Sequence, residues 1–297
     1  MKNILKRLNN SEILVGDGAM GTMLFQRGLK QGEPPESVCL NKPVILEEIA
    51  KAYFEAGADI IETDTFGGSP LKLADYNMQD KTEEINRIAV EIVRKAVSDK
   101  AYISGSVGPS GKKLKPFGDT EPDHIFESYK RQIKALIKAE VDLLCIETMM
   151  DLNESLLAVK AARSLSSEIP IIATFTLNAA SSGFYTMMGN DIPTLCLELE
   201  KAGANIIGSN CGNGIENMIK IAKKFKENST LPIIIQSNAG LPEIKNNDLI
   251  YSETSNFFAE KTKELIETGV SIIGGCCGTT PEYIRAIRKT VDCYESI

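Results

Sequence analysis

The sequence predicts an α/β fold of the (β/α)8 type, a single TIM barrel. Short aliphatic runs typical of buried parallel strands alternate with longer segments that have the period of helices. Several runs follow a small residue that ends a helix and then finish on polar residues, as in Gly57-Ala58-Asp59-Ile60-Ile61-Glu62. Eight strand–helix units in alternation are typical of a barrel.

The strands and helices can be assigned in order along the chain. Four strands follow the helix-end pattern, at 57–62, 140–147, 203–208 and 269–274, and four more are aliphatic runs at 13–16, 102–107, 170–176 and 232–237. The predicted helices lie between them, at 44–56, 82–97, 122–139, 152–165, 192–202, 215–226, 253–268 and 281–290. No Ser/Gly-rich or charged linker interrupts the series, so we expect one domain, residues 1–297.

A doubly wound open sheet is the alternative architecture. Its usual mark is a glycine-rich loop after the first strand, and Asp17-Gly18-Ala19-Met20-Gly21-Thr22 stands at that place. The segment lacks the G-x-G-x-x-G spacing, and no acidic residue closes a second strand at the distance expected for a ribose. The barrel is therefore favoured.

Composition excludes several classes of function. A formal net charge of -7 argues against a nucleic-acid-binding face, which needs basic residues to neutralise phosphates. No apolar run approaches the roughly 18 residues of a membrane helix, and the first ten residues do not resemble a secretory signal. The seven cysteines are odd in number and unevenly spaced, unlike a disulfide framework. We expect a cytoplasmic protein in which cysteine serves metal binding or catalysis.

Polar residues or cysteines end nearly every predicted strand. In a barrel, the active site forms from the carboxyl ends of the strands and the loops that follow them. The residues at these positions are Asp17, Glu62, Asp64, Ser106, Glu147, Thr148, Thr176, Asn178, Asn210, Cys211, Ser237, Asn238, Cys276 and Cys277. Such polarity around one mouth predicts a site there.

Three of these residues, Cys211, Cys276 and Cys277, predict a catalytic zinc site. They end the sixth and eighth strands, and three thiolates with one exchangeable position are typical of a catalytic rather than a structural zinc ion. Glycines on both sides of the Cys-Cys pair let the backbone bend so that both sulfurs face one point. A vicinal disulfide or dithiol redox pair is the alternative.

The other cysteines and the histidine have simpler interpretations. Cysteine is among the most buried residue types, so Cys39, Cys145, Cys196 and Cys293 are interpreted as core or surface thiols. The single histidine, His124, stands at a helix start and is interpreted as a solvated turn residue. A general base would then be a carboxylate, a thiolate or the metal-bound substrate.

Six segments together resemble the homocysteine S-methyltransferase family, and most of all the homocysteine-binding module of cobalamin-dependent methionine synthase. They are Asp17-Gly18-Ala19-Met20-Gly21-Thr22, Glu62-Thr63-Asp64-Thr65-Phe66-Gly67, Gly105-Ser106-Val107-Gly108-Pro109, Glu147-Thr148-Met149, Ser209-Asn210-Cys211-Gly212 and Gly274-Gly275-Cys276-Cys277-Gly278-Thr279. The resemblance covers residues 13–290, and its cysteine motifs are the most specific part.

The resemblance implies a function for each part of the mouth. Zinc would be bound by Cys211, Cys276 and Cys277, with the sulfur of homocysteine as the incoming ligand and Asn238 as the fourth ligand when substrate is absent. The substrate contacts implied are Asp17, Gly18, Ala19, Met20, Glu147 and Asn210, with the amides of 18–20 on the carboxylate and Asp17 and Glu147 on the ammonium group. Zinc coordination deprotonates a thiol whose free pKa is near 8.5, and the thiolate can then attack a methyl carbon.

The methyl donor is predicted mainly by what the sequence lacks. The Asp-x-His-x-x-Gly element of cobalamin modules is absent, so we expect no corrinoid on this chain and a methylated corrinoid on a separate protein or module as donor. Betaine or S-methylmethionine is the alternative, with Phe66, Phe184 and Tyr185 as candidate contacts, although tryptophan is absent. Residues 182–189 also depart from the Gly-Arg-Thr pattern common at this loop.

Three further alternatives remain open. The thiol acceptor could be a compound other than homocysteine. The protein could be a non-transferase barrel in which Glu62, Asp64 and Glu147 hold magnesium or manganese for carbonyl chemistry. It could also be a zinc-holding module that only presents homocysteine to a partner. Zinc stoichiometry and turnover with small donors distinguish these alternatives.

Overall fold

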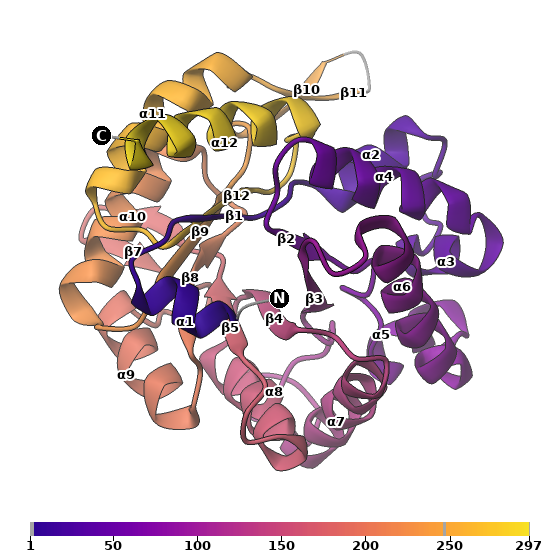
Figure 1. The fold of residues 1–297 in the computed structure, drawn as a ribbon. Helices are drawn as coiled ribbons and strands as arrows, with labels where there is room; N and C mark the ends of the chain where they lie inside the picture. Colours follow the sequence, from indigo (N-terminus) through magenta and orange to yellow (C-terminus); the bar gives the residue numbers. More distant parts are fainter. Residues whose placement is uncertain (1–2, 246–247, 297) are drawn as a thin grey trace.

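The computed structural model describes residues 3–245 and 248–296. Eight parallel strands hydrogen-bond in the order β1-β12-β9-β8-β5-β4-β3-β2. Gly16, directly after β1, pairs in parallel with Ile60 of β2, which brings the two ends of the sheet together. Helices surround this ring of strands (Figure 1), so the predicted (β/α)8 TIM barrel is confirmed.

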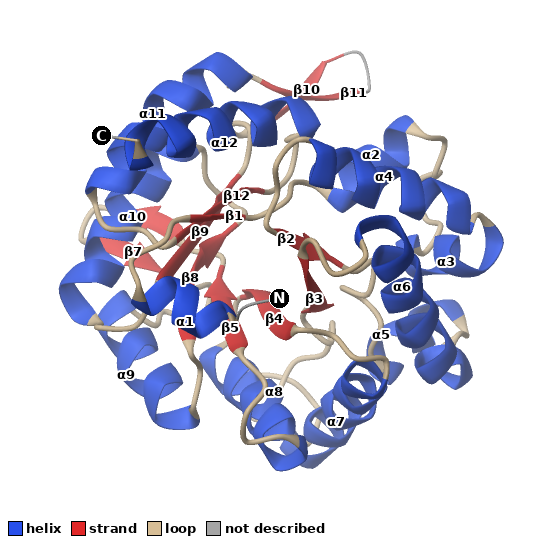
Figure 2. Ribbon diagram, viewed as in Figure 1, coloured by secondary structure: helices blue, strands red, loops and turns tan. Residues whose placement is uncertain are grey.

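Every predicted strand and helix is present, and the differences lie at the element ends. The barrel strands are β1 (Leu14–Val15), β2 (Ile60–Glu62), β3 (Tyr102–Val107), β4 (Leu143–Met149), β5 (Ile171–Phe175), β8 (Ile206–Asn210), β9 (Ile233–Ser237) and β12 (Ile272–Gly275). The helices that cover them, blue in Figure 2, are α4 (Pro43–Glu55), α6 (Thr82–Val97), α7 (Pro122–Lys138), α8 (Leu152–Leu165), α9 (Ile192–Ala202), α10 (Ile215–Asn228), α11 (Ser255–Glu267) and α12 (Pro281–Glu295).

Local sequence explains where the helices begin and end. At α9, the side chain of Asp191 accepts a hydrogen bond from the amide of Thr194 at 3.0 Å, which satisfies a donor that the first helical turn leaves free. The same helix ends at Gly203, whose φ of 97° is a left-handed conformation that favours glycine. Such capping residues fix where each helix ends and therefore where the next strand can begin.

The amino-terminal end of the barrel interior is apolar and covered. Side chains alternate between the two faces of a strand, and the inward residues at this level form one cluster. Its members are Leu14, Ile60, Tyr102, Leu143, Cys145, Ile172, Ile206, Ile234 and Ile272, together with Ile4 and Leu8. The last two belong to α1 (Ile4–Asn9), a helix that the sequence analysis did not predict and that covers this end of the barrel (Figure 1).

The loops at the opposite end carry the other unpredicted elements. Short helices follow β1 and β2: α2 (Met20–Gln26), η1 (Pro35–Ser37), α3 (Val38–Asn41), α5 (Pro70–Leu73), η2 (Ala74–Tyr76) and η3 (Gln79–Lys81). A hairpin of β6 (Asn178–Ala180) and β7 (Gly183–Tyr185) follows β5, and one of β10 (Pro242–Lys245) and β11 (Asp248–Tyr251) follows β9. Within the described residues, no helix has the length and apolar character needed to span a membrane.

Candidate active site

The three cysteines selected from the sequence meet at the carboxyl end of the barrel. The Sγ atoms of Cys211, Cys276 and Cys277 all lie within 4.8 Å of one another, and those of Cys211 and Cys277 are 3.7 Å apart. All three thiols are free and partly buried. Among residues 3–245 and 248–296, they form the one group of three or more potential ligands close enough to hold a metal ion.

The backbone at the ends of two strands positions these sulfurs. Cys211 has a φ of 62°, uncommon for a residue with a side chain, so the chain turns sharply as it leaves β8. The amide of Cys276 donates to Ser237 O at 2.7 Å, and the amide of Ala239 donates to Cys277 O at 2.9 Å. The loops after β9 and β12 are therefore joined directly beside the sulfurs.

Two further side chains reach the sulfur cluster. Asn238 lies beside the thiol of Cys211, and its Oδ1 is buried with no hydrogen-bond partner among the described residues. Hydrogen bonds from Cys276 and Cys277 have the largest effect on Cys211 and lower the pKa of its thiol. Tyr251, at the end of β11, interacts with Cys277, and nothing in the sequence singled it out.

Three carboxyl groups lie in the same mouth, those of Asp17 and Glu147 buried and that of Glu62 partly buried. Burial first, and then the charge of Glu147, raises the pKa of Asp17 to about 7. Burial and the charge of Asp17 raise the pKa of Glu62 to about 7 as well. Burial and the charge of Glu62 hold the pKa of Glu147 well above its usual range. No lysine or arginine of the described chain is among these influences, so the cluster lacks a positive partner.

Hydrogen bonds hold the carboxyl group of Glu147 in place. Ser106 donates to Glu147 Oε1, while Asn210 Nδ2 donates to Glu147 Oε2 at 3.1 Å. The Oδ1 atom of Asn210 accepts from the amide of Thr148 and from Thr174 Oγ1, each at 2.8 Å. These contacts join Glu147 to the residue that directly precedes Cys211.

The remaining two carboxyl groups are held from other strands. Asp17 Oδ2 accepts from the amide of Glu62 at 2.9 Å, and Gln236 Nε2 donates to Glu62 Oε1 at 3.2 Å. Gln236 and Thr174 were not predicted as site residues. A signal for them existed, because each stands two residues after a barrel-lining isoleucine, Ile234 or Ile172, and therefore faces the interior too.

In the first loop, one of the three amides expected to bind the substrate carboxylate already has a partner within the protein. The amide of Ala19 donates to Thr279 Oγ1 at 3.2 Å, and α2 begins at the next residue. An amide that already donates to a hydroxyl is less available to a ligand, so the flanking amides of Gly18 and Met20 are the better candidates for the substrate carboxylate. The role of this loop stays a prediction.

Asp64 does not join the other acidic residues of the mouth. It is buried, and the charge that interacts with it belongs to Glu36. Burial is the main reason that its pKa lies well above the usual range. Because Glu62, Asp64 and Glu147 do not form a group that could hold a metal ion, the geometry speaks against the carboxylate-metal alternative.

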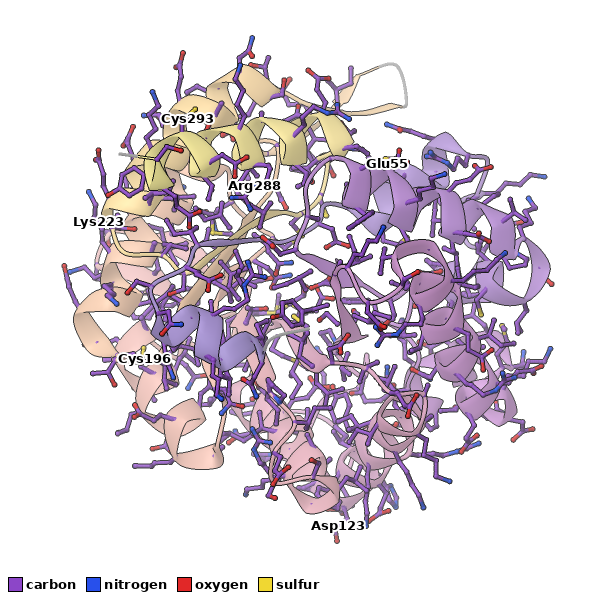
Figure 3. The ribbon with its side chains drawn as sticks, viewed as in Figure 1. Glu55, Asp123, Cys196, Lys223, Arg288 and Cys293 are labelled. Carbon is purple, nitrogen blue, oxygen red and sulfur yellow. The ribbon has the colours of Figure 1, made fainter. Side chains whose placement is uncertain are left out.

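The other strand-end residues have lesser roles. Thr176 donates to Asn210 O at 3.1 Å, Ser237 donates to Asn238 O at 3.0 Å, and Asn178 is exposed in β6. Cys39, Cys145 and Cys196 are buried, and Cys293 is exposed. Figure 3 labels Cys196 and Cys293 on the outer helices α9 and α12. His124 is exposed in the first turn of α7, as predicted.

Residues 14–291 match the model of a protein family described as homocysteine S-methyltransferase. The chain belongs to the homocysteine S-methyltransferase family. Two methionine synthases, from Mycobacterium leprae (strain TN) and Mycobacterium tuberculosis (strain ATCC 25618 / H37Rv), are each 32% identical to this family member. The alignments cover 94% and 95% of this chain but only 24% and 25% of the relatives, so the chain spans a quarter of their length at most.

Solved structures of the same fold extend the comparison. The homocysteine methyltransferase MmuM from Escherichia coli, in its metallated form, has a TM-score of 0.80 and 23% identity over 96% of this chain and 98% of its own. The carboxyl transferase domain of Rhizobium etli pyruvate carboxylase is more distant, with a TM-score of 0.56 and 16% identity over 98% of this chain and 49% of its own. At these identities, the likeness establishes the barrel fold alone.

Proposed function

We propose that this homocysteine S-methyltransferase family member binds zinc through Cys211, Cys276 and Cys277, activates homocysteine as a thiolate and forms methionine. The observation that carries the proposal is the pairing of a three-thiol cluster with a carboxyl cluster inside one barrel mouth. The first can bind a metal and the second an ammonium group. A substrate with a thiol at one end and an ammonium group at the other fits both.

The residues at the sulfur cluster fit a zinc ion. Soft thiolate donors favour zinc over magnesium or calcium, and three of them leave one position open for an exchangeable ligand. The buried Oδ1 of Asn238 lacks a hydrogen-bond partner in the described chain, and a metal ion beside Cys211 would satisfy it. Asn238 is therefore our candidate for the fourth ligand when substrate is absent.

Zinc bound at this site supplies the positive charge that lowers the pKa of a coordinated thiol and makes it a nucleophile at neutral pH. The chain itself orients the substrate. Cys211, Cys276 and Cys277 hold the sulfur end at the mouth, and the polar residues beneath them hold the amino-acid end. A fixed sulfur position matters because in-line attack on a methyl carbon requires aligned reacting atoms.

The carboxyl cluster supports a zwitterionic amino acid as the substrate. Asp17, Glu62 and Glu147 lie close enough to raise one another's pKa, and no basic residue of the described chain is among the groups that act on them most strongly. An ammonium group supplies the missing positive charge. Asn210 donates to Oε2 of Glu147 at 3.1 Å. This hydrogen bond orients the carboxyl group of Glu147 toward the ammonium group.

We further propose that the methyl donor is a methylated corrinoid carried by a separate protein or module. Large apolar side chains are exposed in several loops around the mouth, including Phe66 (39% exposed), Phe117 (74%), Met187 (66%) and Leu241 (60%). Exposed apolar residues gathered around a site are typical of a surface that contacts a partner. The quarter-length match to methionine synthases supports the same interpretation, because the remaining three quarters of those proteins could supply the donor.

Metal analysis and turnover together test the proposal. We expect one zinc ion per chain, lost in Cys276→Ala and retained in Cys293→Ala, whose thiol is exposed on α12 and away from the cluster. Methionine formation from homocysteine is then measured with methylcobalamin, betaine and S-methylmethionine as donors. Turnover with betaine or S-methylmethionine alone would overturn the corrinoid assignment.

X-ray absorption at the zinc edge tests thiol activation directly. We expect homocysteine to replace an oxygen ligand with a fourth sulfur. Unchanged zinc coordination in the presence of homocysteine would contradict the mechanism and require another thiol acceptor. Zinc coordination that changes without turnover by any small donor would instead support a module that presents homocysteine to a partner.

A further inference from the structure

The hairpin after β9 brings a tyrosine to the sulfur cluster. In this hairpin, β10 pairs with β11 in antiparallel register, with Pro242 opposite Tyr251. Tyr251 is therefore at the base of the hairpin, where both strands leave the barrel (Figure 1). Leu241 and Ile250 beside it are 60% and 42% exposed, whereas Tyr251 is partly buried. Its side chain is directed toward the protein although its neighbours face solvent.

The ring of Tyr251 rests on the backbone directly after the Cys-Cys pair. A Cβ atom placed on Gly278 would lie 2.3 Å from Cγ of Tyr251, and 2.5 and 2.7 Å from its two Cδ atoms. Contacts this short are not tolerated, so only glycine leaves room for the ring. Gly278 also has a φ of +83°, a conformation that other residues rarely adopt. The tyrosine ring therefore packs directly against Gly278.

The hydroxyl group at the other end of the ring reaches the thiols. It lies close to the thiol of Cys277 and near those of Cys211 and Cys276. A phenol keeps its proton at neutral pH, so it can donate to a thiolate sulfur.

The loop that carries Tyr251 is hydrogen-bonded to the cysteine loop. The amide of Ala239 donates to Cys277 O at 2.9 Å, and the amide of Glu253 donates to Ala239 O at 3.0 Å. The hydroxyl of Tyr283 on α12 donates to Glu253 O at 2.7 Å. These bonds hold both ends of the hairpin against residue 277, so Tyr251 has a defined position relative to Cys277.

We propose that Tyr251 is a positioning residue for the metal centre, which donates a hydrogen bond from its hydroxyl to Sγ of Cys277 while its ring covers Gly278. The inference rests on the proposed zinc function of the three cysteines. A hydrogen bond to a thiolate fixes the direction of the sulfur and withdraws electron density from it. Groups that orient metal ligands in this way change metal affinity by about 10- to 100-fold when they are removed.

Tyr251→Phe tests the hydroxyl alone, because phenylalanine keeps the ring on Gly278. Purified protein is stripped of metal, and its zinc affinity is measured by competition with a chromophoric chelator. We expect zinc binding to weaken about 10-fold or more. In the cobalt(II)-loaded protein, we expect the sulfur-to-metal charge-transfer band to move to lower energy, because a thiolate without the hydrogen bond gives up its electrons more readily.

Ile250→Ala is the matched control. It alters the adjacent residue of β11, which is exposed and lies on the opposite face of the strand. We expect wild-type zinc affinity and a wild-type cobalt spectrum. A Tyr251→Phe protein with unchanged affinity and an unchanged band would show that Tyr251 only packs, and would overturn the inference while leaving the zinc function intact. Wild-type protein that takes up no zinc would overturn both.

Discussion

At the scale of single residues, the mouth of the barrel combines buried negative charge with an uncommon backbone conformation. Burial raises the pKa values of Asp17, Glu62 and Glu147, and the neighbouring carboxyl charges raise them further. Cys211 and Thr148 adopt φ values of 62° and 58°, which residues with side chains seldom do. Such departures concentrate where side chains must converge on a ligand.

Replacing Glu147 by glutamine should weaken the binding of homocysteine through its ammonium group. Glutamine keeps the shape of the side chain but removes a charge that the ammonium group needs. We expect the KM for homocysteine to rise roughly 30-fold, which corresponds to a loss of about 2 kcal/mol. Steady-state kinetics with 4-mercaptobutanoate, a thiol without the amino group, should show no comparable change.

Glu154→Gln is the control for this prediction. Glu154 is also buried, but it accepts hydrogen bonds from Ser110 and from Tyr129 at 2.8 Å and is not among the groups that interact with Asp17, Glu62 or Glu147. We expect this variant to lose stability and keep the wild-type KM. An equal rise in KM for both thiols in Glu147→Gln would mean that Glu147 does not contact the ammonium group.

At the scale of elements, the two ends of the barrel have different functions. The loops after the strands carry the polar site, whereas α1 covers the opposite end with Ile4 and Leu8. Arg7 of the same helix pairs with Asp59, which also accepts from the amide of Val15 at 2.9 Å and pairs with Arg288 of α12. The helix therefore contributes to stability at a distance from the chemistry.

Leu8→Ala should destabilise the protein without changing its activity. The side chain is 6% exposed and packs on the apolar end of the barrel, so its removal leaves a cavity. We expect the free energy of unfolding to fall by about 2–5 kcal/mol in urea denaturation. Asn9→Ala, at an exposed position of the same helix, should leave stability nearly unchanged. A loss of zinc affinity in folded Leu8→Ala protein would contradict this separation of the two ends.

At the scale of the whole molecule, the carboxyl cluster couples stability to pH. The pKa of Asp17 rises from 3.8 to about 7 on folding, and that of Glu62 rises from 4.5 to about 7. The folded state therefore holds protons that the unfolded state releases. The stability that these groups contribute is present below the unfolded values and is lost as the pH rises through the folded ones.

We expect the substrate-free, zinc-loaded protein to lose stability between about pH 4 and pH 7, the range between the unfolded and folded pKa values of these two groups. Denaturant unfolding at a series of pH values measures this loss. An Asp17→Asn, Glu62→Gln double variant should flatten the dependence, because neither replacement titrates. Bound homocysteine should also reduce the loss of stability with rising pH, since its ammonium group stabilises the ionised carboxyl cluster. Stability that rises across this range would contradict the prediction.

The sequence was sufficient for the repeating part of the fold and for the thiol cluster. Strand–helix alternation is a local property, and the ends of parallel strands must meet at one end of a barrel. Cys211 and Cys276 could therefore be placed together although 64 residues separate them. The hairpins and α1 escaped prediction, because short loop elements have weak local signals and depend on the barrel that they cover.

Strand order did not predict the positions of Asp64 and Tyr251. Asp64 follows the strand end at Glu62, where the alternation of faces no longer applies, and it is buried beside Glu36. Tyr251 is a lone tyrosine in a loop, and only the folded hairpin brings its ring onto Gly278.

The sequence by itself determined the barrel, the end at which the polar strand-end residues gather and the clustering of the three cysteines, because these depend on periodicity and on strand order. The tertiary structure decided which carboxyl groups share the mouth, which hydrogen bonds hold Glu147 and which tyrosine reaches Cys277. Those contacts join segments distant in the chain through loops whose paths no periodic pattern encodes.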